Sequence, residues 1–256
     1  MKINIVTWNV NSIRARLEIL KSYIMEKSPT IIAIQETKVA DSEFPEEVFK
    51  SANYRGVYSG QKSYNGVAIV SKFPIEGFEK NIFEEDSEKR TILIKSTGLT
   101  ILNCYFPHGD VRGEEKFFYK LEFYQRIRNY ILKNGLINER FILLGDFNVA
   151  PEEKDVWDPL LLSGTIGFMK EEQDAFKGLL NIGLTDLFRM FHPDERAFTW
   201  WDYRAGAFRK NEGMRIDHIL ISPSLKEKAQ ACYIDTEPRK LKGASDHAPL
   251  WGEFSF

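Results

Sequence analysis

The feature that most restricts the fold of this chain is a series of short, apolar, β-rich runs. They recur at residues 3–8, 30–35, 66–71, 91–95, 99–106, 141–144, 216–221 and 249–254, with weaker runs at 54–59, 197–200 and 229–234. Several runs are apolar at both odd and even positions, which is typical of strands covered on both faces. Helical spacing occurs at only four places, near 13–26, 45–51, 114–133 and 171–182. This is too much sheet for a simple alternation of strands and helices, so we expect two packed sheets with helices outside.

The composition predicts one domain that spans residues 1–256. The chain is 43% hydrophobic, enough for one large core, and no Gly-, Ser- or Pro-rich tract suggests a linker. Cys104 and Cys232 each lie in an apolar run, which favours buried free thiols and a reducing compartment. Residues Met1 and Lys2 lead directly into a strand, and no apolar run is long enough to cross a bilayer. We therefore expect a cytoplasmic protein with no membrane partner.

Polar side chains stand where several predicted strands end. In RFILLGDFN, residues 140–148, Asp146 shares the parity of Ile142 and Leu144, so it ends a row of core-facing side chains. A carboxylate in that position is costly to bury unless it is paired or coordinated. The complete strand-end set comprises Asn9, Asn11, Glu36, Tyr105, Asp146, Asn148, Asp217, Asp246 and His247.

This strand-end set consists of oxygen donors and acid–base groups. Four of its members are carboxylates, which would repel one another at close range unless a divalent cation neutralised them. Oxygen donors select Mg²⁺, Mn²⁺ or Ca²⁺ over zinc, and Mg²⁺ keeps several waters that phosphate oxygens can replace. The set therefore predicts phosphoester chemistry with Mg²⁺, for which Mn²⁺ would substitute.

Each of these residues also has a structural explanation when it is taken alone. Asp146 could form a turn and Glu36 could begin a helix. His247 alone could be a structural histidine, and Tyr105 could belong to the core or its rim. His108 and His192 lie in loop contexts and are assigned no function. The joint placement of the strand-end set favours a functional site.

Residues 198–215, FTWWDYRAGAFRKNEGMR, mix aromatic with basic side chains. Four cationic residues here outnumber two acidic ones, and two tryptophans, Tyr203 and Phe208 lie among them. Such a mixture suits a phosphate backbone together with an exposed base or sugar. The alternative is an ordinary loop with a tryptophan in the core. The net charge of −2 does not announce nucleic acid, but Arg14, Arg16 and Lys38 beside the strand-end set predict a local basic face.

Seven motifs in order resemble the exonuclease III family of AP endonucleases. They are WNVNSIRAR, QETK, YFPHG, GDFN, FTWWDYR, RIDHIL and SDHAPL, and they run from residue 4 to about residue 254. The resemblance implies a DNase I-like α/β fold, a four-layer α/β/β/α sandwich of two packed mixed sheets with helices outside. It implies a Mg²⁺-dependent DNA repair nuclease that cleaves 5′ to abasic sites and has 3′–5′ exonuclease and 3′ end-cleaning activity. Its partner would be double-stranded DNA with abasic sites or 3′ ends, bound by a monomer.

The matching motifs also imply roles for individual residues. Glu36 would be the principal metal ligand, with Asn9 near it and Asp246 sharing the site. Asp146 would orient or deprotonate the attacking water. His247, oriented by Asp217, would donate hydrogen bonds to the phosphate.

The remaining implied roles concern the phosphate, the metal and the DNA. Asn148 would hold the water or the phosphate, and Tyr105 would contact the phosphate. The candidate metal ligands are in full Asn9, Glu36, Asp146, Asn148, Asp246 and His247. The candidate DNA contacts are Asn11, Arg14, Lys38, Trp200, Tyr203 and Arg204, with Trp200 in the pocket for the abasic sugar.

The sequence also departs from the family's pattern. Residues 151–170 are short and apolar for a DNA-facing loop, and the following KEEQ lacks an expected arginine. This leaves open the grip on DNA and the balance between exonuclease and AP endonuclease activity.

Two alternative functions differ from this reading in what the sequence should contain. A relative acting on phosphoinositides or sphingomyelin should lack the FTWWDYR loop and Lys38, and both are present. A catalytically dead binding protein should have lost a ligand or the Asp–His pair, and none is lost.

Overall fold

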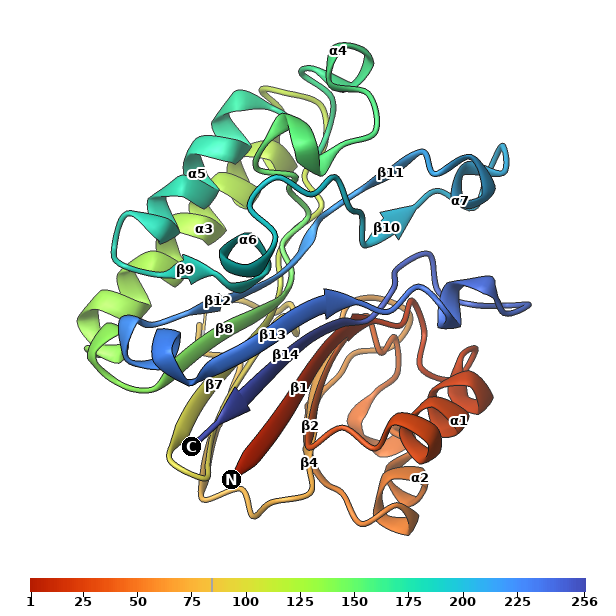
Figure 1. The fold of residues 1–256 in the computed structure, drawn as a ribbon, viewed down its shortest axis with the longest axis vertical. Coiled ribbons are helices and arrows are strands. Elements are labelled where there is room, and N and C mark those ends of the chain that lie inside the picture. The colour runs from red at the N-terminus through yellow and green to blue at the C-terminus, as the bar shows by residue number, and fades with distance from the viewer. Residues whose placement is uncertain (84) are drawn as a thin grey trace.

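Two six-stranded mixed sheets pack face to face in the computed structural model, which describes residues 1–83 and 85–256 (Figure 1). The first sheet has the order β13-β14-β1-β2-β4-β3, with β1 at Lys2–Asn9, β2 at Ile31–Gln35, β3 at Arg55–Ser59, β4 at Val67–Ser71, β13 at Ala229–Ile234 and β14 at Leu250–Ser255. The second has the order β5-β6-β7-β8-β12-β9, with β5 at Gly77–Lys80, β6 at Thr91–Ser96, β7 at Leu99–Tyr105, β8 at Phe141–Asp146, β9 at Thr185–Asp186 and β12 at Asp217–Ile221. A separate ribbon joins β10 (Trp200–Trp201) to β11 (Gly213–Met214).

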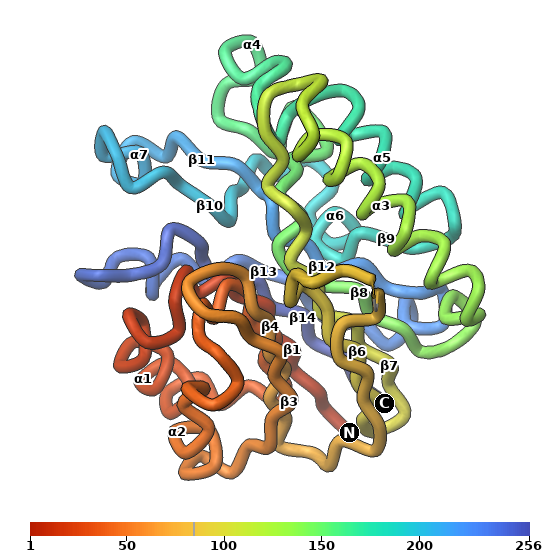
Figure 2. The backbone as a smooth tube through the Cα atoms, turned by 180° about the vertical axis from the view of Figure 1, so that it is seen from behind, coloured from red at the N-terminus to blue at the C-terminus, as the bar shows by residue number. Residues whose placement is uncertain are grey.

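Helices cover the outer face of each sheet. Helices α1 (Leu17–Lys27) and α2 (Glu46–Ser51) lie on the first sheet, whereas α3 (Glu115–Lys133) and α5 (Lys170–Leu180) lie on the second (Figures 1 and 2). Three shorter helices lie in the segments that connect the strands, namely α4 (Pro159–Leu162), α6 (Leu187–Phe191) and α7 (Ala207–Lys210). Short 3-10 turns occupy Asp41–Glu43, Leu136–Asn138, Glu153–Asp155, Pro223–Lys228 and Pro238–Lys240. This order of layers confirms the predicted α/β/β/α sandwich.

The alternation of side chains along the strands explains why both parities are apolar. In β8, Ile142 and Leu144 face the other sheet and join the core between the sheets. Leu143 points the opposite way and packs in the cluster that includes Ile127 of α3. The same division holds in the first sheet, where Val6 packs outward in the cluster that contains α1. Each sheet is therefore buried on both faces, as the sequence predicted.

The remaining differences from the predicted elements are local. The helix expected at 13–26 begins at Leu17, and the strand expected at 197–200 is reduced to the ribbon strand β10. Strand β5 and the short helices α4, α6 and α7 were not predicted, because segments of four or five residues carry too little periodicity. Cys104 and Cys232 are buried and free in the described part of the chain. Among the described residues, no helix combines the length and apolarity that a bilayer crossing requires.

Parallel pairing brings the functional strand ends together. Strand β1 pairs in parallel with β2, and β7 pairs in parallel with β8, so the carboxyl ends of each pair lie at one edge of their sheet. Beyond the sheets at this end project the β10–β11 ribbon with α7 and, separately, the tip that carries α4 (Figures 1 and 2).

Candidate active site

The strand register aligns three predicted site residues across the second sheet. Tyr105 at the end of β7 pairs with Asp146 at the end of β8, and Asp146 pairs with Asp217 at the start of β12. From the facing sheet, the Nδ2 of Asn9 donates to Oδ2 of Asp146 at 2.9 Å and to Oε1 of Glu36 at 2.8 Å. One buried amide therefore joins carboxylates that belong to both sheets.

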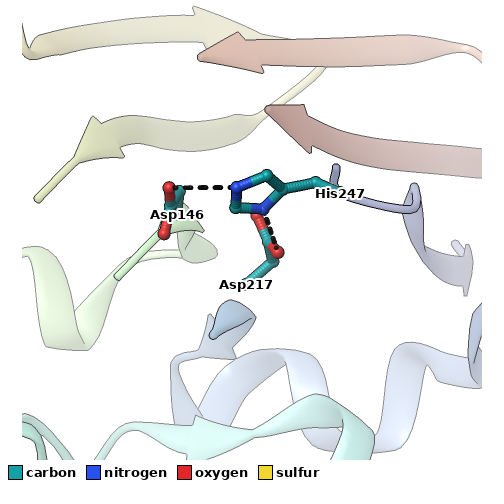
Figure 3. A group of neighbouring side chains, drawn as sticks. All are labelled: Asp146, Asp217 and His247. Carbon is teal, nitrogen blue, oxygen red and sulfur yellow. Dashed lines mark hydrogen bonds and ion pairs between the residues drawn. The ribbon is translucent and has the colours of Figure 1, made fainter. Parts of the chain in front are cut away.

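His247 lies between two buried carboxylates. Its Nδ1 is 2.8 Å from Oδ2 of Asp217, and its Nε2 is 3.8 Å from Oδ2 of Asp146 (Figure 3). The hydrogen bond to Asp217 places a proton on Nδ1 and fixes the orientation of the ring. The Ser245 hydroxyl accepts from the backbone N–H of His247 and so holds the backbone of residues 245–247.

Burial and mutual attraction shift the titration of this group. Burial raises the pKa of Asp146 to about 7, and the charge of nearby His247 only partly opposes this. For His247, burial alone would lower the pKa, but the carboxylates of Asp217 and Asp146 raise it to about 10. The arrangement therefore favours a protonated imidazole at neutral pH beside a carboxyl group that can take up a proton.

Glu36 has a backbone φ of 53° directly after β2 and directs its carboxylate toward the site. Burial by itself would raise the pKa of Glu36, but Lys38 and the amide of Asn9 hold it below the ordinary value. The Nζ of Lys38 lies 2.6 Å from Oε2 of Glu36 and 2.6 Å from Oδ1 of Asn11. Glu36 is therefore ionised and held by a cationic partner.

Hydrogen bonds from Asn11 and Trp200 hold the carboxylate of Asp246. Its Oδ1 accepts from Nδ2 of Asn11 and its Oδ2 accepts from Nε1 of Trp200, each at 3.0 Å. Burial alone would raise its pKa, but the charge of His247 together with these two donors lowers it. A second ionised carboxylate therefore borders the site.

The site opens into a cavity of about 230 Å³ with two kinds of wall. Its polar wall comprises Glu36, Tyr105, Asp146, Asn148, Asp246 and His247, which are all residues predicted from the strand ends. The less polar part of the lining consists of Ile166, Gly167, Trp200, Met214 and Ile216. The cavity thus combines acidic oxygens with an apolar surface.

His108 also lines this cavity, although the sequence analysis assigned it no function. It lies in YFPHG, three residues after the end of β7. The rule that polar residues gather after strand ends would have found it. Ile166 and Gly167 carried no comparable signal, because only the folding of the 151–170 segment back over the cavity places them there.

Oxygen donors in this arrangement fit a hard divalent cation. Asp146, Asp217 and His247 each offer a ligand atom within 4.8 Å of the others and could hold a metal ion. Because His247 and Asp217 already bond each other, the side of the cavity where Glu36 lies could also hold the ion. There the carboxylates of Glu36 and Asp246 offer oxygen ligands that suit Mg²⁺ or Mn²⁺, whereas Asn9 turns its Nδ2 toward Glu36 and Asp146. A cation on Oε2 of Glu36 would compete with the contact from Lys38.

The predicted DNA contacts divide into two groups. Trp200 lines the cavity, and Asn11 and Lys38 contact the lining residues Asp246 and Glu36. The Tyr203 hydroxyl accepts from Arg16 at 2.6 Å and lies 3.5 Å from Nδ2 of Asn11. Arg14 and Arg204 are exposed and pair with Glu43 and Asp202, and neither is among the described residues that line the cavity.

Comparisons with known proteins agree with this geometry. Residues 6–247 match the Endonuclease/Exonuclease/phosphatase family. The exodeoxyribonuclease III of Haemophilus influenzae is 35% identical over 97% of this chain and 98% of its own. An AP endonuclease structure from Archaeoglobus fulgidus superposes with a TM-score of 0.96 at 39% identity, covering 99% of this chain and 100% of that one. The structure of the 3′ phosphatase NExo from Neisseria bound to a product DNA hairpin gives 0.95 at 34% identity, with coverages of 99% and 100%. The chain therefore belongs to the endonuclease/exonuclease/phosphatase family, and within it to the exonuclease III group that its motifs resemble.

Proposed function

We propose that this chain is a Mg²⁺-dependent DNA repair nuclease that hydrolyses the phosphodiester 5′ to an abasic site. We include 3′–5′ exonuclease and 3′ end-cleaning activity in the same site. The observation that carries the proposal is the chain of contacts from Asp217 through His247 to Asp146, and from Asp146 through Asn9 to Glu36. The names of the relatives, which include an exodeoxyribonuclease and an AP endonuclease, support it.

Asp146 is the proton acceptor in this proposal. Its pKa of about 7 lies near the working pH, where a carboxylate both exists in the basic form and takes a proton readily. The backbone N–H of Asn148 donates to Oδ1 of Asp146 at 2.9 Å, and Asn9 occupies Oδ2. These two contacts orient the carboxylate before the attacking water arrives.

His247 and Tyr105 are the proposed donors to the phosphate. Held in its protonated form by Asp217, His247 presents its Nε2 proton to an oxygen on which charge develops during attack. One positioned donor of this kind contributes roughly 10²- to 10³-fold in rate. Burial, with help from Glu36 and Asp146, keeps the pKa of Tyr105 well above its ordinary value, so its phenol also remains a donor.

A divalent ion would be held by the carboxylates of Glu36 and Asp246. Asn9 would join them through its Oδ1, the atom that accepts from the N–H of Asn11. When bound, it supplies Lewis-acid stabilisation of the phosphate oxygens. The Nδ2 of Asn148 donates to the carbonyl of Phe106 at 2.9 Å, which fixes the amide with its oxygen available to water or metal.

The apolar wall supports selection of a sugar without its base. Trp200, Met214 and Ile216 border a cavity of about 230 Å³, below the range of common ligand pockets of about 300–1,000 Å³. An abasic nucleotide has no base to unstack, so its extrusion costs less than flipping a paired nucleotide. We propose that Asn11, Lys38, Trp200 and Tyr203 contact the DNA next to this sugar.

Arg14 and Arg204 are proposed as outer contacts to the backbone. A phosphate would have to replace the carboxylate that each now pairs with, Glu43 and Asp202 respectively. We also propose that the chain forms one domain, acts as a monomer and works in the cytoplasm.

The test is incision of a duplex that carries one abasic-site analogue. We expect cleavage 5′ to the analogue in Mg²⁺ or Mn²⁺ and none in EDTA, with a 3′-recessed duplex and a 3′-phosphate duplex measured in parallel. Dephosphorylation of inositol phosphates without cleavage of any DNA would overturn the proposal.

A further inference from the structure

The side chain of Lys120 is buried directly beneath the active site, although no step described above uses it. It belongs to the second turn of α3 and is 0% exposed, and its partner Glu172 in α5 is also fully buried. The Nζ of Lys120 donates to the carboxylate of Glu172, to the carbonyl of Asn148 at 2.7 Å and to the carbonyl of His108 at 3.1 Å. The three protons of one ammonium are therefore matched by three acceptors.

Two of those acceptors belong to the loops that form the cavity. Residues 106–110 follow β7 and carry His108, whereas residues 147–150 follow β8 and carry Asn148. Because Lys120 bonds to one carbonyl in each loop, its side chain ties the two loops together, in addition to the hydrogen bond from Nδ2 of Asn148 to the carbonyl of Phe106. Asn148 has a backbone φ of 53°, and its N–H and side chain contact Asp146 and Phe106. Movement of this loop would therefore displace the carboxylate proposed as the base.

The packing around the ammonium leaves little freedom. Gly109 has a φ of +80°, and a Cβ at this position would lie 3.0 Å from Cδ of Lys120. Oε2 of Glu172 also accepts from the N–H of Met169 at 3.0 Å, so the start of α5 is tied to the same ion pair. A buried pair of this kind contributes little net stability compared with apolar residues of similar volume. Its satisfied geometry instead fixes one arrangement of the groups around it.

We propose that Lys120 is a positioning residue that holds the His108 and Asn148 loops in the catalytic arrangement. It touches neither the cavity nor a substrate, and it acts through the two carbonyls that it binds. The consequence for catalysis rests on the proposed function, whereas the consequence for loop order does not.

The decisive variant is Lys120→Met with Glu172→Gln. Removing both charges avoids a buried, unpaired carboxylate, and glutamine can still accept from Met169. We expect the folded double variant to lose about 10- to 100-fold in kcat because of misplaced groups, while KM changes by less than about threefold. The matched control is Lys133→Met, which replaces an exposed lysine in the last turn of the same helix. This control should retain native kcat.

Hydrogen exchange provides a readout that is independent of activity. In the double variant, amides of residues 106–110 and 147–150 should exchange at least about tenfold faster, while amides in the middle of β8 stay protected. A merely structural role would lower stability and leave kcat of the folded enzyme and these loop rates unchanged, which would overturn the inference. If the double variant does not fold, kcat and hydrogen exchange are measured on Lys120→Gln instead. A lower kcat with faster loop exchange would support the inference, and no change in either would overturn it. A native chain that cleaves no DNA would overturn the proposed function, and the exchange rates would still decide the role of Lys120.

Discussion

Asn9 and Asp146 lie in different sheets, yet their side chains are joined by a hydrogen bond of 2.9 Å between Nδ2 and Oδ2. The same amide donates to Glu36, so the relative position of the proposed base and the proposed metal ligand is set by the packing of the two sheets. The core between the sheets therefore determines the geometry of the site.

Replacement of Asn9 by alanine removes a donor from both carboxylates. The hydrogen bond from Asn9 lowers the pKa of Asp146, so its loss should raise that pKa further above 7. We expect kcat at pH 7 to fall by about 10- to 100-fold and the acidic limb of the rate profile to move to higher pH. Single-turnover rates between pH 5 and 9 check this, and an unchanged limb would contradict it. Asn134→Ala, in the exposed loop after α3, is the control.

The native enzyme should show a bell-shaped dependence of kcat/KM on pH. Below about 7, Asp146 becomes protonated and the rate falls; toward 10, His247 loses its proton and the rate falls again. In Asp217→Asn, the largest upward influence on the His247 pKa is removed, so burial should move the alkaline limb to lower pH. We also expect a rate loss of roughly 10²- to 10³-fold. An alkaline limb that stays in place in this variant would show that His247 is not the group responsible. Asp174→Asn, at an exposed position of α5, serves as control.

Glu36→Gln should weaken the use of metal more than the binding of DNA. The substitution keeps the shape of the side chain and its contact with Asn9 but removes the negative charge. The Mg²⁺ concentration for half-maximal activity should rise by at least about tenfold, and saturating Mn²⁺ should restore part of the rate. The measurement is a metal titration of EDTA-treated protein. An unchanged titration would place the ion elsewhere, and Glu47→Gln, an exposed residue of α2, gives the baseline.

We expect the Asp186 carboxylate to affect the stability of the fold rather than catalysis. Its Oδ2 lies 2.8 Å from Nη1 of the buried Arg215, and its Oδ1 accepts from the first N–H groups of α6. Burial alone would raise its pKa, but Arg215 and His218 hold it well below the ordinary value of 3.8. A lowered folded-state pKa stabilises the fold above pH 4 and loses that effect as the pH falls toward the folded value.

Asp186→Asn should therefore cost about 3–5 kcal/mol at pH 7, because a buried charge pair is broken while the helix cap is kept. The free energies of unfolding of the variant and the native protein are measured with urea at pH 7 and pH 3. Their difference should be smaller at pH 3. A difference that is the same at both pH values would argue against the charge as its cause. Asp158→Asn, which caps the exposed helix α4 and has no buried cationic partner among the described residues, should change stability by less than about 1 kcal/mol.

The fold and the polar wall of the site were predictable because both follow from alternation along strands. Apolar residues on both parities required sheets covered on both faces, and Asp146 continued the parity of Ile142 and Leu144. Parallel pairing of β1 with β2 and of β7 with β8 then brought the strand ends together. These are local patterns, and the sequence displays them directly.

The features that were missed depend on contacts between distant segments. Lys120 and Glu172 are 52 positions apart, and each resembles an ordinary solvent-facing residue of an amphipathic helix. His108 is the exception, because its place three residues after β7 was a local signal that the strand-end rule could have used. Ile166, by contrast, reaches the cavity only because its loop folds back. Tertiary packing decides such placements, and one sequence does not encode them as a local pattern.

The most direct test of the account compares Asp146→Asn with the native enzyme on a duplex that contains one abasic-site analogue. Asparagine keeps the shape of the side chain but cannot accept the proton of the attacking water. Single-turnover incision in Mg²⁺ should slow by about 10²- to 10⁴-fold, while the Kd for the same duplex changes by less than about threefold. Incision by this variant at the native rate would contradict the assignment of Asp146 as the base, and with it the proposed mechanism.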